Sequence, residues 1–204
     1  MGQNAIPSAV ANKVGGGSVL IQAGKQLDAW MSNRHAKYYN AAYSPTAFFA
    51  TAAGVTTTVG LATTYTGLCI SNPSTSTVNL VIQRVSGIFA VNSTAITGIG
   101  LIRGYASGGV TAHTTPGTVQ PCNTGVTGTT GVALADTACT LVGTPIWAGW
   151  LTSLITTTVV GSTFVFDNDG DQIIQPGGYL AIGTTAASGS SGLYATISWD
   201  EIAL

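Results

Sequence analysis

The sequence is poor in charge. Six of its 204 residues are Lys or Arg and seven are Asp or Glu, 6% in all, whereas about a quarter of the residues of an ordinary soluble domain are charged. The net charge of −1 leaves no overall field that would attract nucleic acid or an anionic membrane. The cores of protein interfaces are depleted in Lys, Glu and Asp. We therefore expect a subunit of an assembly, with no nucleic acid or membrane as partner.

The few charges are also separated by sign. Every cation precedes position 104, and every anion except Asp28 follows position 135. Opposite charges pair either within one subunit or across an interface, where they help to set its register. For the second case the candidate residues are Arg34, Lys37, Asp200 and Glu201.

Cysteines and long apolar runs are scarce as well. The three cysteines, Cys69, Cys122 and Cys139, are an odd number with no secretory signal ahead of them, which argues against a disulfide framework. We interpret Cys69 as a small buried residue, whereas Cys122 and Cys139 flank a Thr/Gly segment and are either bonded or free. The most apolar stretch, 146–160, is broken by Thr and Ser and is too short to span a bilayer. These absences predict a chain made in the cytoplasm.

Threonine, serine and glycine take the place of charge. Threonine is β-branched and suits a pleated surface, and a hydrophobic content of 45% argues against disorder. Short β-forming runs alternate with turn signals at intervals of about 8–12 residues, and no window has the caps and stripe of a helix. We predict an all-β protein with a jelly-roll-like β-sandwich. The expected strands are 19–22, 26–31, 36–42, 47–52, 56–62, 67–71, 77–92 (with a bulge or bend at Gly87), 99–105, 146–154, 157–166, 179–184 and 193–202.

Two segments depart from this pattern. Residues 1–17 are small or polar and end in three glycines, which predicts an extended N-terminal arm and a Gly hinge ahead of a single β-sandwich domain over 18–204. Ile6, Val10 and Val14 recur every four residues, so the arm either orders on a neighbouring subunit or is a disordered terminus. Residues 106–145 are rich in Gly, Thr and Pro, and predict a long loop insertion that is functional or packed on a partner.

One acidic cluster is a weak candidate for a metal site. Asp167, Asp169 and Asp171 alternate along the chain, and three carboxylates can bind Ca²⁺ through oxygen. The Gly and Glu positions of an EF-hand loop are absent, however. The Asp169-Gly170 pair between two apolar runs is a strong hairpin signal, so we favour a turn over a cation site.

Nothing in the sequence predicts an enzyme. His35 and His113 are the only histidines, and neither has a Cys or His at the spacing of a zinc site. The sequence has no G-x-S-x-G nucleophile motif, so a Ser–His–Asp triad assembled in space is the remaining route to a hydrolase. We expect no catalytic residue, no cofactor and no small-molecule substrate.

A small basic and aromatic cluster is the nearest approach to a nucleic-acid site. Arg34 and Lys37 lie among Trp30, Tyr38 and Tyr39, and such a mixture can stack and hold a single strand. Two cations make a thin electrostatic footprint, and aromatic residues in strands usually pack in cores or interfaces. We favour the packing role.

Three stretches together resemble tailed-bacteriophage virion structural proteins of the capsid decoration, or cement, type. The first runs from Gly24-Lys-Gln-Leu-Asp28 through Arg34-His-Ala-Lys-Tyr-Tyr39 to Tyr43, the second from Gly67-Leu-Cys-Ile-Ser-Asn72-Pro-Ser74 to Val78-Asn-Leu-Val-Ile82, and the third from Ile174-Gln-Pro-Gly-Gly178 to Ala195-Thr-Ile-Ser-Trp199-Asp-Glu201. The resemblance implies a jelly-roll or TNF-like sandwich that forms homotrimers on the surface of the capsid. It brings no catalytic residues, and the 106–145 segment has no counterpart in it.

Composition and resemblance together predict a non-enzymatic virion protein that stabilises the phage head by binding capsomers. Its partners would be the major capsid protein or other virion proteins. The alternative is a receptor- or glycan-recognition module of a fibre or tail, with Trp147, Trp150 or the 106–145 segment meeting the glycan.

Overall fold

The computed structural model describes residues 42, 46–91, 95, 97–105, 110–125, 130–154, 162–189 and 192–204, together with four short strands nearer the N-terminus. The chain divides into two units, Met1–Tyr39 and Asn40–Leu204. In the first unit β1 (Lys13–Val14) pairs with β2 (Gly17–Ser18), and β3 (Gln22–Ala23) pairs with β4 (Ala29–Trp30). The arm residues Ile6 and Val10, the side chain of Val14, and the cations Arg34 and Lys37 lie outside what the structure describes.

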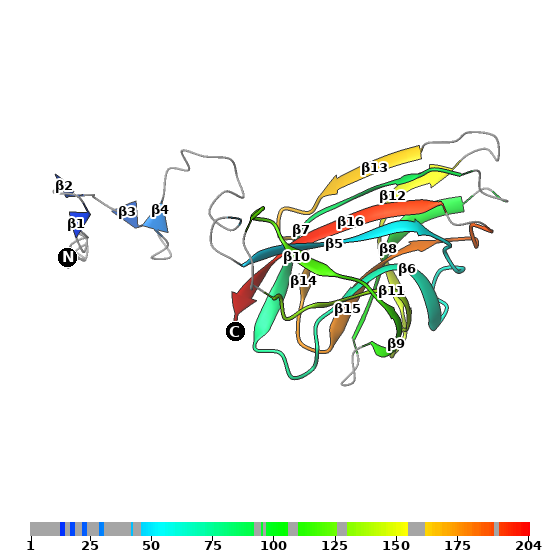
Figure 1. Cartoon of the computed structure of the whole chain (residues 1–204), viewed down its shortest axis with the longest axis horizontal. Coiled ribbons are helices and arrows are strands. Elements are labelled where there is room, and N and C mark those ends of the chain that lie inside the picture. The colour runs from blue at the N-terminus through cyan, green and yellow to red at the C-terminus, as the bar shows by residue number, and fades with distance from the viewer. Residues whose placement is uncertain are drawn as a thin grey trace, which may run out of the picture. The chain divides into compact units, whose positions relative to one another are not determined.

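The second unit is a sandwich of two antiparallel sheets, each of six strands (Figure 1). Sheet one has the order β10-β5-β16-β7-β13, with β14 also paired to β7, and sheet two has the order β12-β8-β15-β6-β11-β9. The strands are β5 (Ala47–Val55), β6 (Thr64–Ser71), β7 (Val78–Phe89), β8 (Thr97–Tyr105), β9 (Thr111–Pro116), β10 (Val119–Pro121), β11 (Leu134–Thr140), β12 (Ile146–Leu154), β13 (Ser162–Asp167), β14 (Ile173–Ile174), β15 (Gly178–Thr184) and β16 (Leu193–Ala203). Among the described residues no helix is long and apolar enough to cross a membrane.

The strand order is that of a jelly roll. Eight strands pair in a nested way, the first of them with the last: β5 with β16, β6 with β15, β7 with β13, and β8 with β12. Hydrogen-bonded pairing of β16 with β7, and of β15 with β8, completes the two sheets. This is a long hairpin wrapped into two layers, as in the jelly roll. The predicted all-β, jelly-roll-like sandwich is confirmed.

Alternation along the strands builds the core, as β16 shows. Its residues Leu193, Ala195, Ile197 and Trp199 are buried between the sheets, while the residues that alternate with them are more exposed. The indole of Trp199 stacks on Phe48 of β5, with ring centroids 6.4 Å apart. Other strands contribute to the same cluster through Leu68, Ile70, Leu80, Ile82, Val85, Phe89, Ile99, Leu101, Leu180 and Ile182.

The segment 106–145, expected to be a long loop, contains three of these strands. β11 adds to β6 and β9 adds to β11, which widens sheet two, whereas β10 adds to β5 in sheet one. The sequence signal was weak because all six residues of β9 are exposed and β10 has three residues. Edge strands of this kind show little apolar alternation.

Candidate functional site

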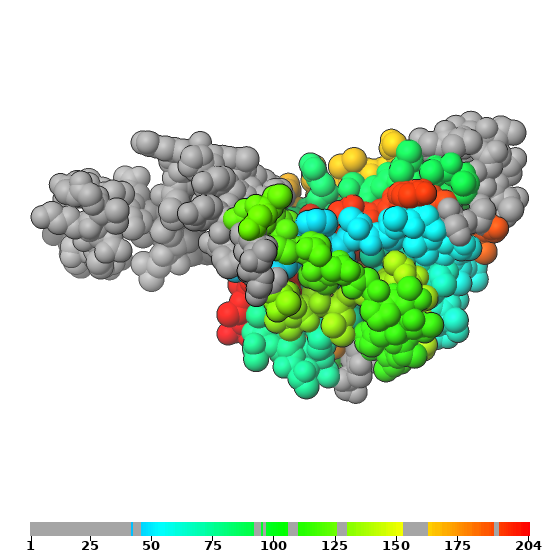
Figure 2. Space-filling view, viewed as in Figure 1, coloured from blue at the N-terminus to red at the C-terminus, as the bar shows by residue number. Residues whose placement is uncertain are grey.

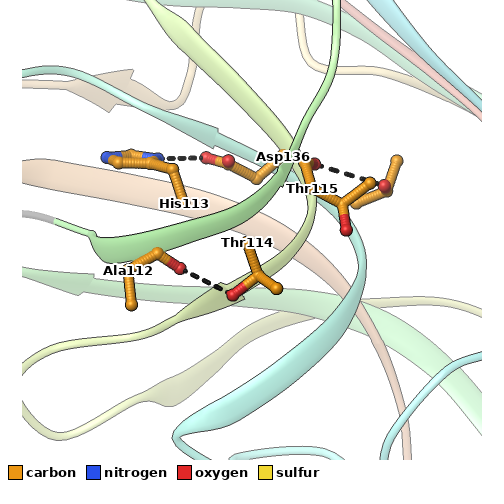
Figure 3. Close-up of polar contacts among 6 residues, drawn as sticks. Ala112, His113, Thr114, Thr115 and Asp136 are labelled. Atoms are coloured by element: carbon orange, nitrogen blue, oxygen red, sulfur yellow. Dashed lines mark hydrogen bonds and ion pairs between the residues drawn. The ribbon is translucent and has the colours of Figure 1, made fainter.

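A buried carboxylate and a histidine meet where β9 joins sheet two (Figure 3). The Nδ1 atom of His113 lies 2.7 Å from Oδ2 of Asp136. The Asp136 side chain is 0% exposed and that of His113 is 34% exposed. Burial raises the pKa of Asp136, and the hydrogen bond and charge of His113 partly offset that rise.

This pair has two of the three parts of a hydrolytic triad. In such triads a buried Asp orients His through Nδ1, and the other ring nitrogen activates a hydroxyl or thiol. Among the described residues none presents a hydroxyl or thiol to His113. The neighbouring hydroxyl of Thr114 donates instead to the carbonyl of Ala112, at 3.1 Å (Figure 3). The pair links β9 to β11, whose ladder is irregular at two places.

The thiol of Cys69, next to this pair, is buried. Cys69 of β6 lies opposite Asp136 in the ladder, and its pKa is raised well above the ordinary value, chiefly by burial and then by Cys139. A thiol with a raised pKa stays protonated at neutral pH and is a poor nucleophile. Cys122 follows β10 in sheet one, where its N–H donates to the carbonyl of Ala47. All three cysteines are free.

The acidic cluster is a turn, and its first carboxylate is engaged. The N–H of Asp171 donates to the carbonyl of Asn168, and the two residues between them have φ of 51° and 90°, as in a type I′ turn. The Asp167 carboxylate accepts from Nε of Arg84, on β7, at 2.6 Å. Among the described residues no group of three His, Cys, Asp or Glu side chains could hold a metal ion.

Glu201, a sequence candidate for an interface, is held by its own chain. Both of its carboxylate oxygens accept from the N–H of Val132 at 2.9 Å. Oε1 also accepts from the N–H of Ala133 at 3.1 Å and from Nε1 of Trp199 at 3.3 Å. Charge-assisted bonds of this kind are stronger than neutral ones, so Glu201 ties the 106–145 segment to β16. Asp200, the neighbouring candidate, is half-buried on the outer face of sheet one.

An open groove of about 560 Å³ lies at one end of the sandwich. Arg103 and Tyr105 of β8 and Ile146 of β12 form one side, and Asp171 and Ile173 lie on the other. Tyr179 of β15 also lines it, and burial raises the pKa of its phenol to about 12. The described lining includes a single carboxylate, that of Asp171, and no His or Cys.

The outer face of sheet one is a broad surface with few charges. Its rows carry hydroxyl and apolar residues, such as Val165–Ser86–Thr196 across β13, β7 and β16. Two of its ions, Arg84 and Asp167, neutralise each other. Tyr194 and Ile202 of β16 are exposed on the same face. This composition is that of interface cores, which are depleted in unpaired charge.

The edge strands of the two sheets differ in their protection. β9 and β10 contain Pro116 and Pro121, and β12 has two irregularities of register; proline and bulges both hinder pairing with another strand. β13 pairs regularly with β7 and has no Pro or Lys. Its Val165 is 64% exposed and its Phe166 is 41% exposed. Figure 2 shows β13 at the rim of the described sandwich, and β7 is the only described strand that pairs with it.

Comparisons with protein-family models, with curated proteins and with solved structures give no match for this chain. The site description therefore depends on the geometry. Sequence reasoning missed Asp136 as a partner of His113, and it missed the β13 edge. The contact between His113 and Asp136 has no local signal, because 23 residues separate them. The lack of Pro and Lys in 162–167 could have been read from the sequence.

Replacing His113 with Ala should raise the pKa of Asp136 further, because the two effects that lower it are removed. A raised carboxyl pKa means that the native state holds its proton more tightly than the unfolded state does. The resulting stability is present at low pH and is lost as pH rises through the native pKa. The variant should therefore lose stability relative to the wild type as pH rises above about 4. Carbon-13 NMR titration and unfolding at several pH values would measure both effects.

The matched control for this variant is Thr111→Ala, on the same exposed strand. An unchanged Asp136 pKa in the His113 variant would contradict the assignment.

Replacing Glu201 with Ala should lower the free energy of unfolding by about 1–3 kcal/mol, because N–H groups of the buried residues Ala133 and Trp199 lose their acceptor. The oligomeric mass should stay the same, since the partners of Glu201 lie in its own chain. Urea unfolding and light scattering would measure the two quantities. Asp171→Ala, which removes an exposed carboxylate, is the control. A lowered mass without a loss of stability would instead place Glu201 at an interface between subunits.

Proposed function

We propose that this chain is a non-enzymatic virion structural protein of the capsid-decoration type. In this role it forms a homotrimer, binds the major capsid protein or other virion proteins, and stabilises the head of a tailed bacteriophage. The observation that carries the proposal is the joint presence, on sheet one, of a nearly neutral outer face and an unprotected apolar edge at β13. A fold alone does not define a function, but jelly rolls are frequent in viral capsid domains.

Assembly is favourable only if few charged groups lose their contact with water. Burying an unpaired ion at an interface is expensive. The outer face of sheet one has few ions among its hydroxyl and apolar residues: the Arg84–Asp167 pair and the half-buried Asp200. Hydroxyl groups stay solvated before assembly and can hydrogen-bond after it. An open strand edge adds direction, because backbone N–H and C=O groups pair only in register. Together these features support attachment by surface complementarity.

A glycan-recognition function is favoured by one separate observation, the stacked tryptophan pair of β12, in which Trp150 is exposed. It concerns the other sheet, and so it is compatible with assembly through sheet one.

Replacing Val165 with Lys should weaken assembly, because a lysine on an edge strand disfavours strand addition and would be desolvated at the interface. Light scattering on the full chain should show a wild-type oligomer and a shift of the variant towards the monomer. Thr115→Lys, on the proline-containing edge β9, should leave the mass unchanged. A monomeric wild type, or a Val165 variant with wild-type mass, would contradict assembly through β13.

Virions produced by the genome that encodes the chain should contain it in a fixed ratio to the major capsid protein. Mass spectrometry of purified particles measures that ratio, and electron microscopy should place the extra density on the head. Removing the gene should give heads that lose their DNA at a lower temperature. Particles that lack the chain while the lysate contains it would overturn the proposal.

A further inference from the structure

Two tryptophans of β12 lie on the outer face of sheet two, although their spacing would put them on opposite faces. Residues three apart in a regular strand point to opposite sides. The ladder between β12 and β8 shifts register between Trp147 and Gly149, and an extra residue of this kind reverses the alternation. Ala148 and Leu151 accordingly pack on the inner core, and Trp147 packs on the outer cluster. The bulge thus brings Trp147 and Trp150 together.

The two indoles stack on each other, and glycines make room for them. Their ring centroids are 4.5 Å apart and their planes meet at 26°. A Cβ atom at Gly100 would lie 3.0 Å from the ring of Trp147 and 2.6 Å from the carbonyl oxygen of Gly149. One at Gly98 would lie 3.2 Å from the ring of Trp150. A side chain at Gly60 would collide with the ring of Trp147, and a Cβ atom at Gly183 would lie 3.2 Å from that ring.

The two tryptophans differ in their exposure to solvent. Trp147 is half-buried on the sheet, whereas Trp150 is 56% exposed. Among the described residues none accepts a hydrogen bond from either indole N–H. Val59 and Leu61, on either side of Gly60, are exposed as well, and Leu61 has φ of 68°, which is uncommon for a bulky residue and is found more often at functional sites. Packing explains Trp147 but leaves the exposure of Trp150 unexplained.

The chemistry around the pair excludes several kinds of ligand. The residues opposite the two tryptophans in the ladder, and the glycines against their rings, are uncharged. Arg103, the nearest cation along β8, lies on the other face of that strand. A phosphate backbone needs cations. A cation cage needs rings that surround the ligand, whereas these two rings cover each other. A neutral ligand with polarised C–H groups for the indole face and hydroxyls for the rim meets the description. The rim includes Thr185, whose methyl carbon and the Trp150 ring both lie within 3.5 Å of the Cβ position of Gly98.

We propose that the Trp147–Trp150 pair, with the rim at Thr185, binds a neutral sugar ring of a polysaccharide. The exposed face of Trp150 stacks on the C–H face of the sugar, and the indole N–H groups and the rim hydroxyl meet its hydroxyls. The site lies on the outer face of sheet two. Attachment through sheet one therefore leaves it facing solvent, where it can hold the particle to a glycan-coated surface.

The test uses the full chain on an array of neutral and sulfated oligosaccharides, followed by calorimetry with the neutral hexasaccharides of glucose and mannose. Wild-type protein should bind a neutral glycan, and the sugar should shift its tryptophan fluorescence to shorter wavelength. Trp150→Ala should weaken binding by about tenfold or more. Trp150→Phe should keep part of the affinity and lose most of the fluorescence shift. Tyr194→Ala, which removes an exposed aromatic residue from sheet one, should bind as the wild type does.

Three results would overturn the proposal: no neutral glycan bound at millimolar concentration, binding to sulfated glycans only, or equal losses in the Trp150 and Tyr194 variants. Light scattering separates this proposal from the assembly function, since Trp150→Ala should keep the wild-type oligomeric mass. If the Ala variant does not fold, the Phe variant and the wild-type fluorescence shift decide the matter.

Discussion

The two hydrogen-bonded ladders of β16 hold the described domain together. This strand pairs with β5 on one side and with β7 on the other, so it joins the first, third and last strands of the nested order. Its inward residues place Trp199 in the centre of the core, against Phe48. Just beyond Trp199, Glu201 accepts N–H groups from the 130–133 segment. The chain that leads into β11 is therefore anchored to the same strand that closes the sandwich.

Scarcity of charge has a different consequence on each outer face. On sheet one, the ions Arg84 and Asp167 neutralise each other within a hydroxyl and apolar surface that ends at an open edge. On sheet two, the outer face holds a second apolar cluster around Tyr65, Cys69 and Tyr179. On that face, Gly98 and Gly100 of β8 leave room for the rings of Trp150 and Trp147. The first face suits protein assembly, and the second provides a rigid aromatic surface on which a flat, neutral ligand can stack.

Much of the strand pattern was predictable because alternation is a local property. The expected strands at 67–71, 99–105, 179–184 and 193–202 all lie within observed strands. The prediction of a strand over 56–62 was wrong. Val59 makes one isolated bridge, and the backbone of Leu61 is in the left-handed conformation, which interrupts extended structure before β6 begins. The bulge expected at Gly87 lies at Gln83 instead, where the β7–β16 ladder skips one residue. Gly87 is glycine because the ring of Phe164 and the carbonyl of Tyr194 occupy the space of a side chain.

The sequence by itself determined the class of fold, the neutral surfaces and the turn at 168–171, since alternation, composition and turn chemistry depend on near neighbours. Only the tertiary structure decided that Asp136 meets His113, that Glu201 accepts the N–H groups of Val132 and Ala133, and that Trp147 and Trp150 share a face. Each of these depends on register between strands, and a shift of one residue moves a side chain to the opposite face. Register is set by pairing across the sheet and by bulges, so the local sequence of one strand does not reveal it.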